Sequence, residues 1–173
     1  MKSKGYIHVY TGNGKGKTTA ALGLALRAVG AGKKVFFAQF VKGKIYSEIE
    51  ATRKFVPAIT IKQYGLGCFI VEEPTDADIQ AARKGLTEVA DILKSEKYDV
   101  VVLDEANIAL YYQLFSTDEF LDILQNKKQE TEIVITGRYA PPELIEMAEL
   151  VTDMQEVKHY YTKGIKARKG IEF

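Results

Sequence analysis

The sequence predicts an α/β domain in which helices flank a mostly parallel central sheet. Short apolar runs alternate along the chain with longer amphipathic stretches, from Tyr6–Tyr10 to Leu150–Val157. This alternation is typical of strands that are joined by helical crossovers. The run Val35–Phe40 shows no polar alternation until its end, as expected of a strand buried on both faces. A chain of 173 residues is within the usual size of one domain, so we expect a single domain over residues 1–173.

The first half of the chain favours three strands separated by two helices. Glycines at Gly30–Gly32 follow the first helical stretch and suit the left-handed conformations of a helix end. The pattern Ser47–Glu50, SEIE, is a capping box and predicts the start of a short helix. The expected elements are a strand over Tyr6–Tyr10, a helix from Gly16 or Lys17 to about Val29, a strand over Val35–Phe40, a helix to about Phe55 and a strand over Thr60–Tyr64.

The second half continues the same alternation. The run Asp99–Ala106, DVVVLDEA, is the strongest strand signal in the chain and contains two adjacent carboxylates. Apolar residues recur at helical spacing over Asp76–Lys94, which predicts a long amphipathic helix. The remaining expected elements are a loop over Gly65–Asp76, a capped helix over Ser116–Gln125, a strand over Glu132–Arg138, a helix over Pro141–Glu149, a last strand within Leu150–Val157 and a polar tail, Lys158–Phe173.

Composition and charge exclude several classes of protein. The formal net charge is +1, which does not favour binding to nucleic acid or to a membrane surface. The single cysteine, Cys68, excludes an intramolecular disulfide and a cysteine-rich metal site. No apolar stretch approaches the roughly 20 residues that a membrane helix needs. We therefore expect a reduced, cytoplasmic protein with no nucleic-acid or membrane partner.

The segment Thr11–Thr18, TGNGKGKT, lies between the first strand and the first helix and has the composition of a phosphate-binding loop. Its glycines let the backbone wrap around a phosphate chain, and the N-terminus of the following helix adds N–H donors. Lys17 can reach the terminal phosphates, and the Thr18 hydroxyl is placed to ligate Mg²⁺. The general pattern has glycine where this chain has Thr11, so the loop is a variant. The alternative is a glycine-rich turn with solvated lysines.

A second motif, VVVLDE, ends in Asp104 and Glu105. A carboxylate at the end of a buried strand beside a phosphate-binding loop binds Mg²⁺ directly or through water. The alternative is a strand that merely ends in acidic residues. The two motifs together predict a three-layer P-loop NTPase fold of the RecA-like type.

The motifs resemble, in order, those of the ATP:corrinoid adenosyltransferase family of the P-loop type. The resemblance rests on YTGNGKGKTTAALGLALRAVGAGKKV, then QFVKG, VVLDE and ITGR, and finally the tail VKHYYTKGIKARKGIEF. It covers nearly the whole chain. The substitution of the first loop glycine is itself similar to the family pattern.

The resemblance implies that a corrinoid with cobalt reduced to Co(I) attacks the 5′ carbon of ATP. The adenosyl group moves to cobalt, and inorganic triphosphate leaves. It also implies that ATP lies reversed in the loop, that Mg²⁺ or Mn²⁺ assists, that a reduced flavoprotein supplies electrons and that the enzyme is a homodimer. Because Co(I) is itself a strong nucleophile, this chemistry needs no protein nucleophile or general base.

The matched positions give a set of candidate site residues. Lys42 and Arg138 follow strand ends, where open α/β sheets bind ligands, although each is equally compatible with an ordinary loop residue. Phe69 lies in the region that the family uses to displace the lower axial ligand of cobalt, with a structural core aromatic as the alternative. The candidates are Lys17, Thr18 and Glu105 for catalysis; Gly12, Asn13, Gly14, Lys15, Gly16, Lys17, Thr18, Thr19, Lys42 and Arg138 for ATP; Thr18, Glu105 and Asp104 for the metal; and Phe69 for the corrinoid.

Two other functions use the same loop. A small-molecule kinase needs an arginine-rich lid, but the five arginines of this chain are scattered: Arg27, Arg53, Arg83, Arg138 and Arg168. A RecA-like ATPase that drives a partner or binds DNA needs a basic face, which the near-zero net charge does not favour. Release of ADP and phosphate supports either alternative, whereas release of triphosphate supports adenosyl transfer.

Overall fold

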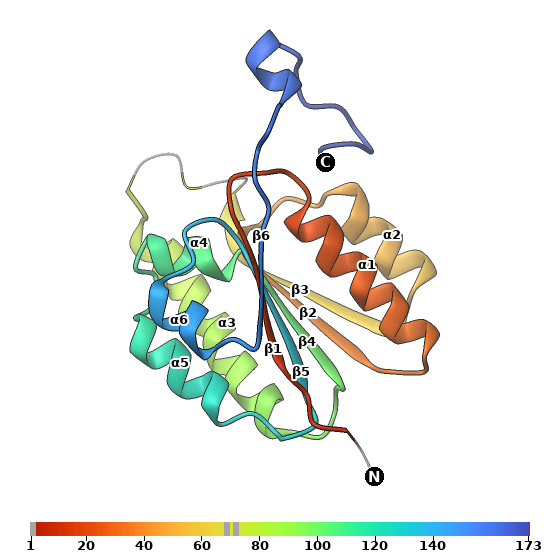
Figure 1. Ribbon diagram of the computed structural model, residues 1–173, viewed down its shortest axis with the longest axis vertical. Coiled ribbons are helices and arrows are strands. Elements are labelled where there is room, and N and C mark those ends of the chain that lie inside the picture. Colours follow the sequence, from red (N-terminus) through yellow and green to blue (C-terminus); the bar gives the residue numbers. More distant parts are fainter. Residues whose placement is uncertain (1–2, 68–69, 71–72) are drawn as a thin grey trace.

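A computed structural model describes residues 3–67, 70 and 73–173 of the chain. Its centre is a six-stranded sheet in the order β3-β2-β4-β5-β1-β6, in which every neighbouring pair of strands is parallel (Figure 1). The predicted parallel sheet is therefore confirmed. The strands are β1 (Ile7–Thr11), β2 (Val35–Lys42), β3 (Ile59–Gly67), β4 (Val100–Asp104), β5 (Glu132–Thr136) and β6 (Leu150–Asp153).

Helices cover both faces of the sheet and complete three layers. Two helices, α1 and α2, lie on one face, and α3 to α6 lie on the other (Figure 1). This arrangement confirms the predicted α/β class and is consistent with the three-layer P-loop fold. The helices are α1 (Lys17–Gly30), α2 (Ser47–Phe55), α3 (Asp76–Lys94), α4 (Ala106–Tyr111), α5 (Thr117–Gln125) and α6 (Pro142–Met147).

Strand β2 shows why its sequence has no polar alternation. Val35 and Phe37 pack under α1 and α2, whereas Phe36 and Phe40 pack under the helices of the opposite face. Every residue of β2 is buried. Since side chains alternate between the two faces of a strand, a central strand between two helical layers must be apolar on both.

The helix starts agree with the predictions except at α2. Thr75 caps α3 through a reciprocal capping box with Asp78, and the Ser116 hydroxyl accepts the Glu119 N–H at the start of α5. The capping box expected at Ser47 is wrong, because the N-cap of α2 is Tyr46 and Ser47 is already helical. The Ser47 hydroxyl donates instead to the Phe173 carbonyl, 3.1 Å away.

Helix α4 was not expected from the sequence. Glu105 adopts a left-handed conformation, φ 58°, and acts as the N-cap of α4, so the chain leaves β4 directly into a helix. The apolar run Asp99–Ala106 hides this turn, because one pattern spans the strand and the start of the helix. Strand β6 is also shorter than the predicted segment and ends at Asp153.

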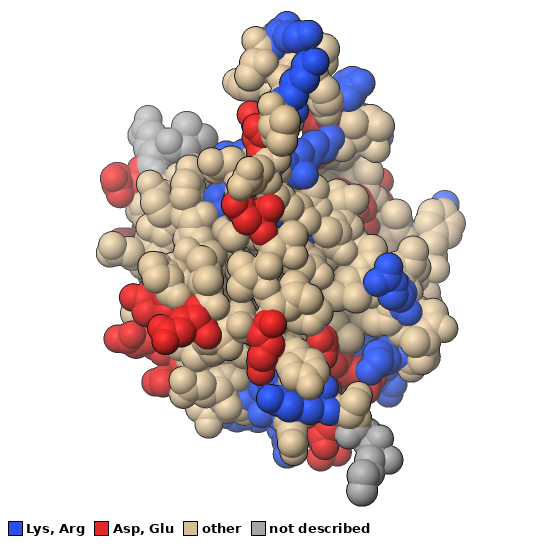
Figure 2. All heavy atoms as spheres, viewed as in Figure 1, with Lys and Arg blue, Asp and Glu red and all other residues tan. Residues whose placement is uncertain are grey.

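The chain after β6 rises from the carboxyl edge of the sheet and turns back toward the start of α2 (Figure 1). It contains one turn of 3₁₀ helix, Tyr160–Lys163, and its lysines and arginine are exposed, as the protruding segment in Figure 2 shows. Within the described part of the chain, no helix is both long and apolar enough to cross a membrane.

We expect Phe120→Ala to lower the free energy of unfolding by about 3–5 kcal/mol, because the ring is fully buried and stacks on Phe115. Urea denaturation followed by circular dichroism measures this loss. The matched control is Phe55→Ala, since Phe55 is 69% exposed and its removal should cost at most about 0.5 kcal/mol. Equal losses in the two variants would contradict the described core.

Candidate active site

A cavity of about 560 Å³ opens at the carboxyl ends of the parallel strands. Parallel α/β sheets bind ligands at this edge, and the volume is within the usual range of small-molecule sites. The loop between β1 and α1 supplies one part of the lining. The end of β2 and residues after β3, β4, β5 and β6 supply the rest. The lining residues are Asn13, Gly14, Lys15, Gly16, Lys17, Thr18, Thr19, Val41, Lys42, Ile70, Glu105, Ile108, Tyr112, Arg138, Tyr139, Glu156, His159 and Glu172.

Two glycines of the loop lie directly against the chain that follows β6. A Cβ atom on Gly12 would meet the Asp153 carboxylate at 2.1 Å, and one on Gly14 would meet the Met154 carbonyl at 2.6 Å. The Gly14 N–H donates to that same Met154 carbonyl at 2.6 Å. Glycine is therefore required at these positions for packing within the protein, in addition to any role in wrapping a ligand.

Lys17 opens α1 and lies beneath the loop. Its ammonium group donates to the carbonyls of Gly12, at 2.6 Å, and Gly14, at 2.7 Å. Burial lowers its pKa, and the nearby Arg138 cation lowers it further, whereas Glu105 opposes the shift. An ammonium group has three N–H donors, so two are used within the loop and one remains for a ligand.

Asp104 at the end of β4 is fully buried and ties together three neighbouring elements. One carboxylate oxygen accepts the hydroxyls of Thr18, at 2.8 Å, and Thr136, at 2.6 Å. The other accepts Gln39 Nε2 at 2.9 Å. The donors come from α1, β5 and β2, so this one side chain fixes the positions of three walls of the cavity.

Lys42 brings a positive charge to the centre of three oxygen-bearing side chains. Its Nζ lies 3.2 Å from Glu105 Oε1, 3.4 Å from Thr18 Oγ1 and 3.6 Å from Asp104 Oδ2. Burial by itself lowers the pKa of Lys42, but the two carboxylates outweigh it and raise the pKa overall. Burial raises the pKa of Glu105, and Lys42 opposes that shift.

Strained backbone gathers around the cavity. Three of the non-glycine residues with positive φ among the described residues line it: Val41 at 65°, Glu105 at 58° and Tyr139 at 60°. Such a conformation costs about 1–3 kcal/mol for each residue, and it persists where surrounding structure imposes it, often at functional sites. At Val41 it coincides with an irregularity in the pairing of β2 that precedes Lys42.

The turn after β5 carries Arg138 to the loop between β1 and α1. Asn107 Nδ2 of α4 donates to the Gly137 carbonyl at 2.9 Å and fixes the start of the turn. Arg138 then donates to the Asn13 carbonyl at 3.3 Å. The guanidinium group therefore joins Lys15, Lys17 and Lys42 among the cations that line the cavity.

Part of the cavity lining is aromatic and apolar. Tyr112 and Tyr139 line the cavity together with Ile70 and Ile108, and the Tyr111 ring lies between the two tyrosines, 5.3 and 4.4 Å from their ring centroids. The Tyr112 hydroxyl donates to the Ile70 carbonyl at 3.3 Å. The cavity thus combines cations that suit an anion with side chains that suit flat, apolar groups.

The predicted site residues come together with few exceptions. Asn13 to Thr19, Lys42, Glu105 and Arg138 all line the cavity, and Asp104 lies directly behind Thr18. Gly12 is absent from the lining and contributes its carbonyl to Lys17. Phe69, the candidate for the corrinoid, lies outside the described residues.

The sequence analysis did not single out Gln39, Thr136 or the tyrosine wall. Gln39 had a usable signal, because it is a polar residue within a strand that is otherwise apolar up to Phe40. Thr136 stands at the end of a buried strand beside the ITGR motif, a position that also favours a site residue. The tyrosines had no comparable signal, since their meeting depends on how α4 and the turn after β5 approach each other.

Comparison with known proteins assigns the chain to a family. The family model described as ATP:corrinoid adenosyltransferase BtuR/CobO/CobP matches residues 3–173. The chain belongs to the ATP:corrinoid adenosyltransferase family. It is 39% identical to the corrinoid adenosyltransferase of Pseudomonas aeruginosa over 98% of this chain and 84% of that protein.

Two further relatives show the same full-length similarity. A corrinoid adenosyltransferase of Escherichia coli K12 is 34% identical over 98% of this chain and 86% of its own length. The corrinoid adenosyltransferase CobA of Salmonella typhimurium is 33% identical over 100% of this chain and 88% of its own length. Membership in the family supports ATP-dependent adenosylation of a corrinoid and does not favour the kinase or RecA-like ATPase alternatives.

We expect Thr136→Val to lower the free energy of unfolding by about 1–3 kcal/mol. The change keeps the shape of the side chain but leaves the buried Asp104 carboxylate and the Glu105 N–H, 3.1 Å from the lost hydroxyl, each short of a partner. Chemical denaturation measures the loss. Thr60→Val on β3 is the control, because the Thr60 hydroxyl has no hydrogen bond among the described residues. An unchanged stability in Thr136→Val would show that Asp104 does not depend on this donor.

Proposed function

We propose that this member of the family transfers the 5′-deoxyadenosyl group of ATP to the Co(I) centre of a reduced corrinoid and releases inorganic triphosphate. The two candidate corrinoid substrates are cob(I)alamin and cob(I)yrinic acid a,c-diamide. In this reaction the cobalt electron pair forms the Co–C5′ bond, and the C5′–O bond electrons leave with the triphosphate. The observation that carries the proposal is a single cavity lined by Lys17, Lys42, Arg138 and two tyrosines, in a chain that matches the family over residues 3–173.

The cationic side of the cavity suits the triphosphate. Lys17, Arg138 and the N–H groups at the start of α1 lie at the loop and are fixed in place by the fold. These donors would stabilise the negative charge that develops on the leaving triphosphate. Such groups also hold ATP in one pose, which is the main requirement when the nucleophile is the cobalt of the second substrate. We assign triphosphate binding to the loop residues Gly12–Gly14 and Gly16–Thr19 with Lys42 and Arg138. Lys15, which the sequence analysis also placed among the ATP-binding residues, donates to Glu172 in the structure.

The residues present fit a divalent cation, Mg²⁺ or Mn²⁺, bound together with ATP. Thr18, Glu105 and Asp104 already surround one positive charge, the Lys42 ammonium group, with oxygen atoms. Among the described residues, no three His, Cys, Asp or Glu side chains form a closed metal cluster. Mg²⁺ does not require one, since it commonly uses one or two carboxylates, substrate phosphates and water. Thr18 and Glu105 would hold the ion, with Asp104 orienting Thr18, and the bound ion would neutralise charge on the triphosphate.

The aromatic wall suits the flat, largely apolar substrate groups. Tyr112 and Tyr139 line the same cavity as the cations, so a base or a corrin ring could pack on them while the triphosphate is held by the loop. Phe69 remains our candidate for contact with the lower face of the corrinoid. The resemblance also supports a reduced flavoprotein as electron donor and a homodimer, and the composition supports a cytoplasmic location.

An anaerobic assay with MgATP and chemically reduced cob(I)alamin tests the proposal. We expect a light-sensitive cobalt–carbon product, followed by its absorbance, together with one equivalent of inorganic triphosphate identified by ion chromatography. A parallel assay with reduced cob(I)yrinic acid a,c-diamide compares the two corrinoids. Steady release of ADP and phosphate without a cobalt product would instead favour a kinase or an ATPase.

We expect Lys17→Ala to weaken MgATP binding at least about tenfold, because it removes a charge-assisted hydrogen bond to the triphosphate. Isothermal titration calorimetry measures the dissociation constant. The control is Lys33→Ala, which removes an exposed lysine beyond the far end of α1 and should leave binding unchanged. Retention of wild-type affinity in Lys17→Ala would exclude the loop as the triphosphate site.

A further inference from the structure

The segment that follows β6 supplies part of the cavity lining. Glu156, His159 and Glu172 of this segment line the cavity, although they are remote in sequence from the loop between β1 and α1. The segment is anchored where it begins, by the hydrogen bond between Gly14 and Met154. What holds its other end determines whether residues 156–172 form a stable roof.

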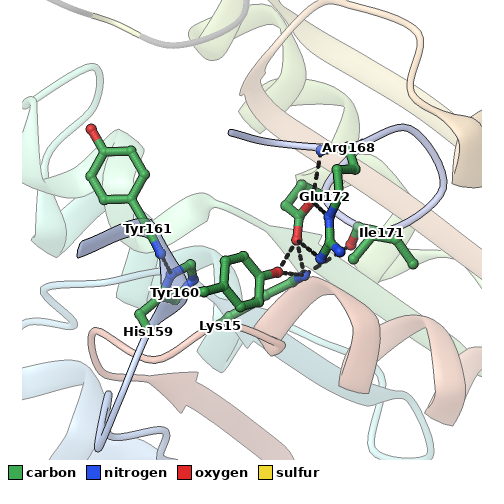
Figure 3. A network of polar contacts seen from close by, with 7 residues as sticks. All are labelled: Lys15, His159, Tyr160, Tyr161, Arg168, Ile171 and Glu172. Carbon is green, nitrogen blue, oxygen red and sulfur yellow. Dashed lines mark hydrogen bonds and ion pairs between the residues drawn. The ribbon is translucent and has the colours of Figure 1, made fainter. Parts of the chain in front are cut away.

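Lys15 supplies that second anchor. Its ammonium group donates to Glu172 Oε1 at 2.8 Å, to the Ile171 carbonyl at 3.0 Å and to the Tyr160 hydroxyl at 3.2 Å (Figure 3). All three acceptors belong to the segment after β6. An ammonium group has three N–H donors, so this segment takes the full capacity of Lys15. Lys17 differs, because it keeps one donor free.

Glu172 is in turn the centre of the contacts within the segment. Its carboxylate accepts from Lys15 and from the Tyr160 hydroxyl, and its second oxygen accepts the Arg168 N–H at 2.7 Å (Figure 3). The Lys15 and Tyr160 hydrogen bonds hold the pKa of Glu172 far below its usual range. The Arg168 guanidinium also lies over the Tyr160 ring, 5.0 Å from its centroid. Glu172 therefore joins both ends of the returning segment to the loop.

We propose that Lys15 is a positioning residue, which holds residues 156–172 as the roof of the nucleotide cavity through Glu172 and leaves the triphosphate to Lys17 and Arg138. The identity of the nucleotide rests on the proposed function. The roof itself rests on contacts within the protein. Its effect on the ligand is to slow escape from the cavity, since Glu156 and His159 lie between the two anchors.

The size of the expected effect follows from the exposure of the ion pair. The Lys15 side chain is 41% exposed and that of Glu172 is 16% exposed, so solvent screens the pair in part. Pairs of this kind contribute little, so we expect a change of at most about fivefold in the population of the open roof. The overall fold should be unaffected, because the roof lies outside the two hydrophobic cores.

The test is a double-mutant cycle with Lys15→Met, Glu172→Gln and the combined variant. Limited trypsin digestion with mass spectrometry measures cleavage within the roof, at Lys163, Lys166 and Arg168, in protein without nucleotide. Calorimetry measures the dissociation constant for MgATP. Lys33→Met and Glu146→Gln are matched controls, since they remove the same charges from exposed positions on other elements. Thermal unfolding checks that every variant is folded.

We expect each single variant to raise both the cleavage rate and the dissociation constant about two- to fivefold, and the combined variant to add nothing further. Unchanged cleavage would overturn the roof. Lys15→Met could also weaken MgATP binding by the same factor in the Glu172→Gln protein as in the wild-type protein. That result would overturn the assignment of Lys15, because it would show direct contact with the triphosphate. Tighter binding by Glu172→Gln would also overturn it, since Glu172 would then compete with the ligand.

The two proposals can fail separately. If the wild-type protein does not bind MgATP, the proposed function fails, and the cleavage measurements still test the roof without any ligand. If it binds MgATP and forms triphosphate while cleavage is the same in all variants, the function stands and the roof is wrong.

Discussion

A carboxylate that has no contact with solvent must find its hydrogen-bond donors within the protein, and Asp104 finds them on three neighbouring elements. Thr18, Gln39 and Thr136 each supply one donor. These hydrogen bonds satisfy Asp104, and they also fix the start of α1 and the carboxyl ends of β2 and β5 around β4. The buried hydrogen bonds of Asp104 therefore fix the positions of the elements that form the cavity, independently of any ligand.

The cations around this cluster differ in what holds them. Lys42 is paired with carboxylates, Lys17 is bound to loop carbonyls and Arg138 reaches the loop from the turn after β5. Lys15 belongs to the same sequence motif as Lys17 but donates to Glu172 of the segment after β6. The lysines of one motif therefore differ in their partners: Lys15 is bound by the segment after β6, whereas Lys17 is bound within the loop and keeps one donor for a ligand.

The strained residues connect this electrostatic arrangement to the fold. Val41, Glu105 and Tyr139 each follow or end a sheet strand and adopt positive φ where the chain turns into the cavity. Their cost, about 1–3 kcal/mol each, is offset by the packing of a sheet that is buried on both faces. A rigid sheet can hold side chains at its edge in positions that a free loop would not keep, which is the condition for presenting two large substrates to each other.

The sequence alone determined that helices flank a parallel sheet and the order of most strands and helices along the chain. It also determined the loop that carries Lys17 and Thr18. These features follow from local periodicity and from a motif that is contiguous in the chain. It did not reveal α4, because one apolar run covers both β4 and the helix start, and it placed a cap at Ser47 that the structure does not form.

Only the tertiary structure decided which distant residues meet. The bonds of Asp104 to Gln39 and Thr136, the meeting of the tyrosines and the anchoring of residues 156–172 on Lys15 all join segments that are far apart in sequence. Hydrophobic periodicity reports which face of an element is buried but not which side chain opposes it. That information arises only when the sheet order brings the strand ends together.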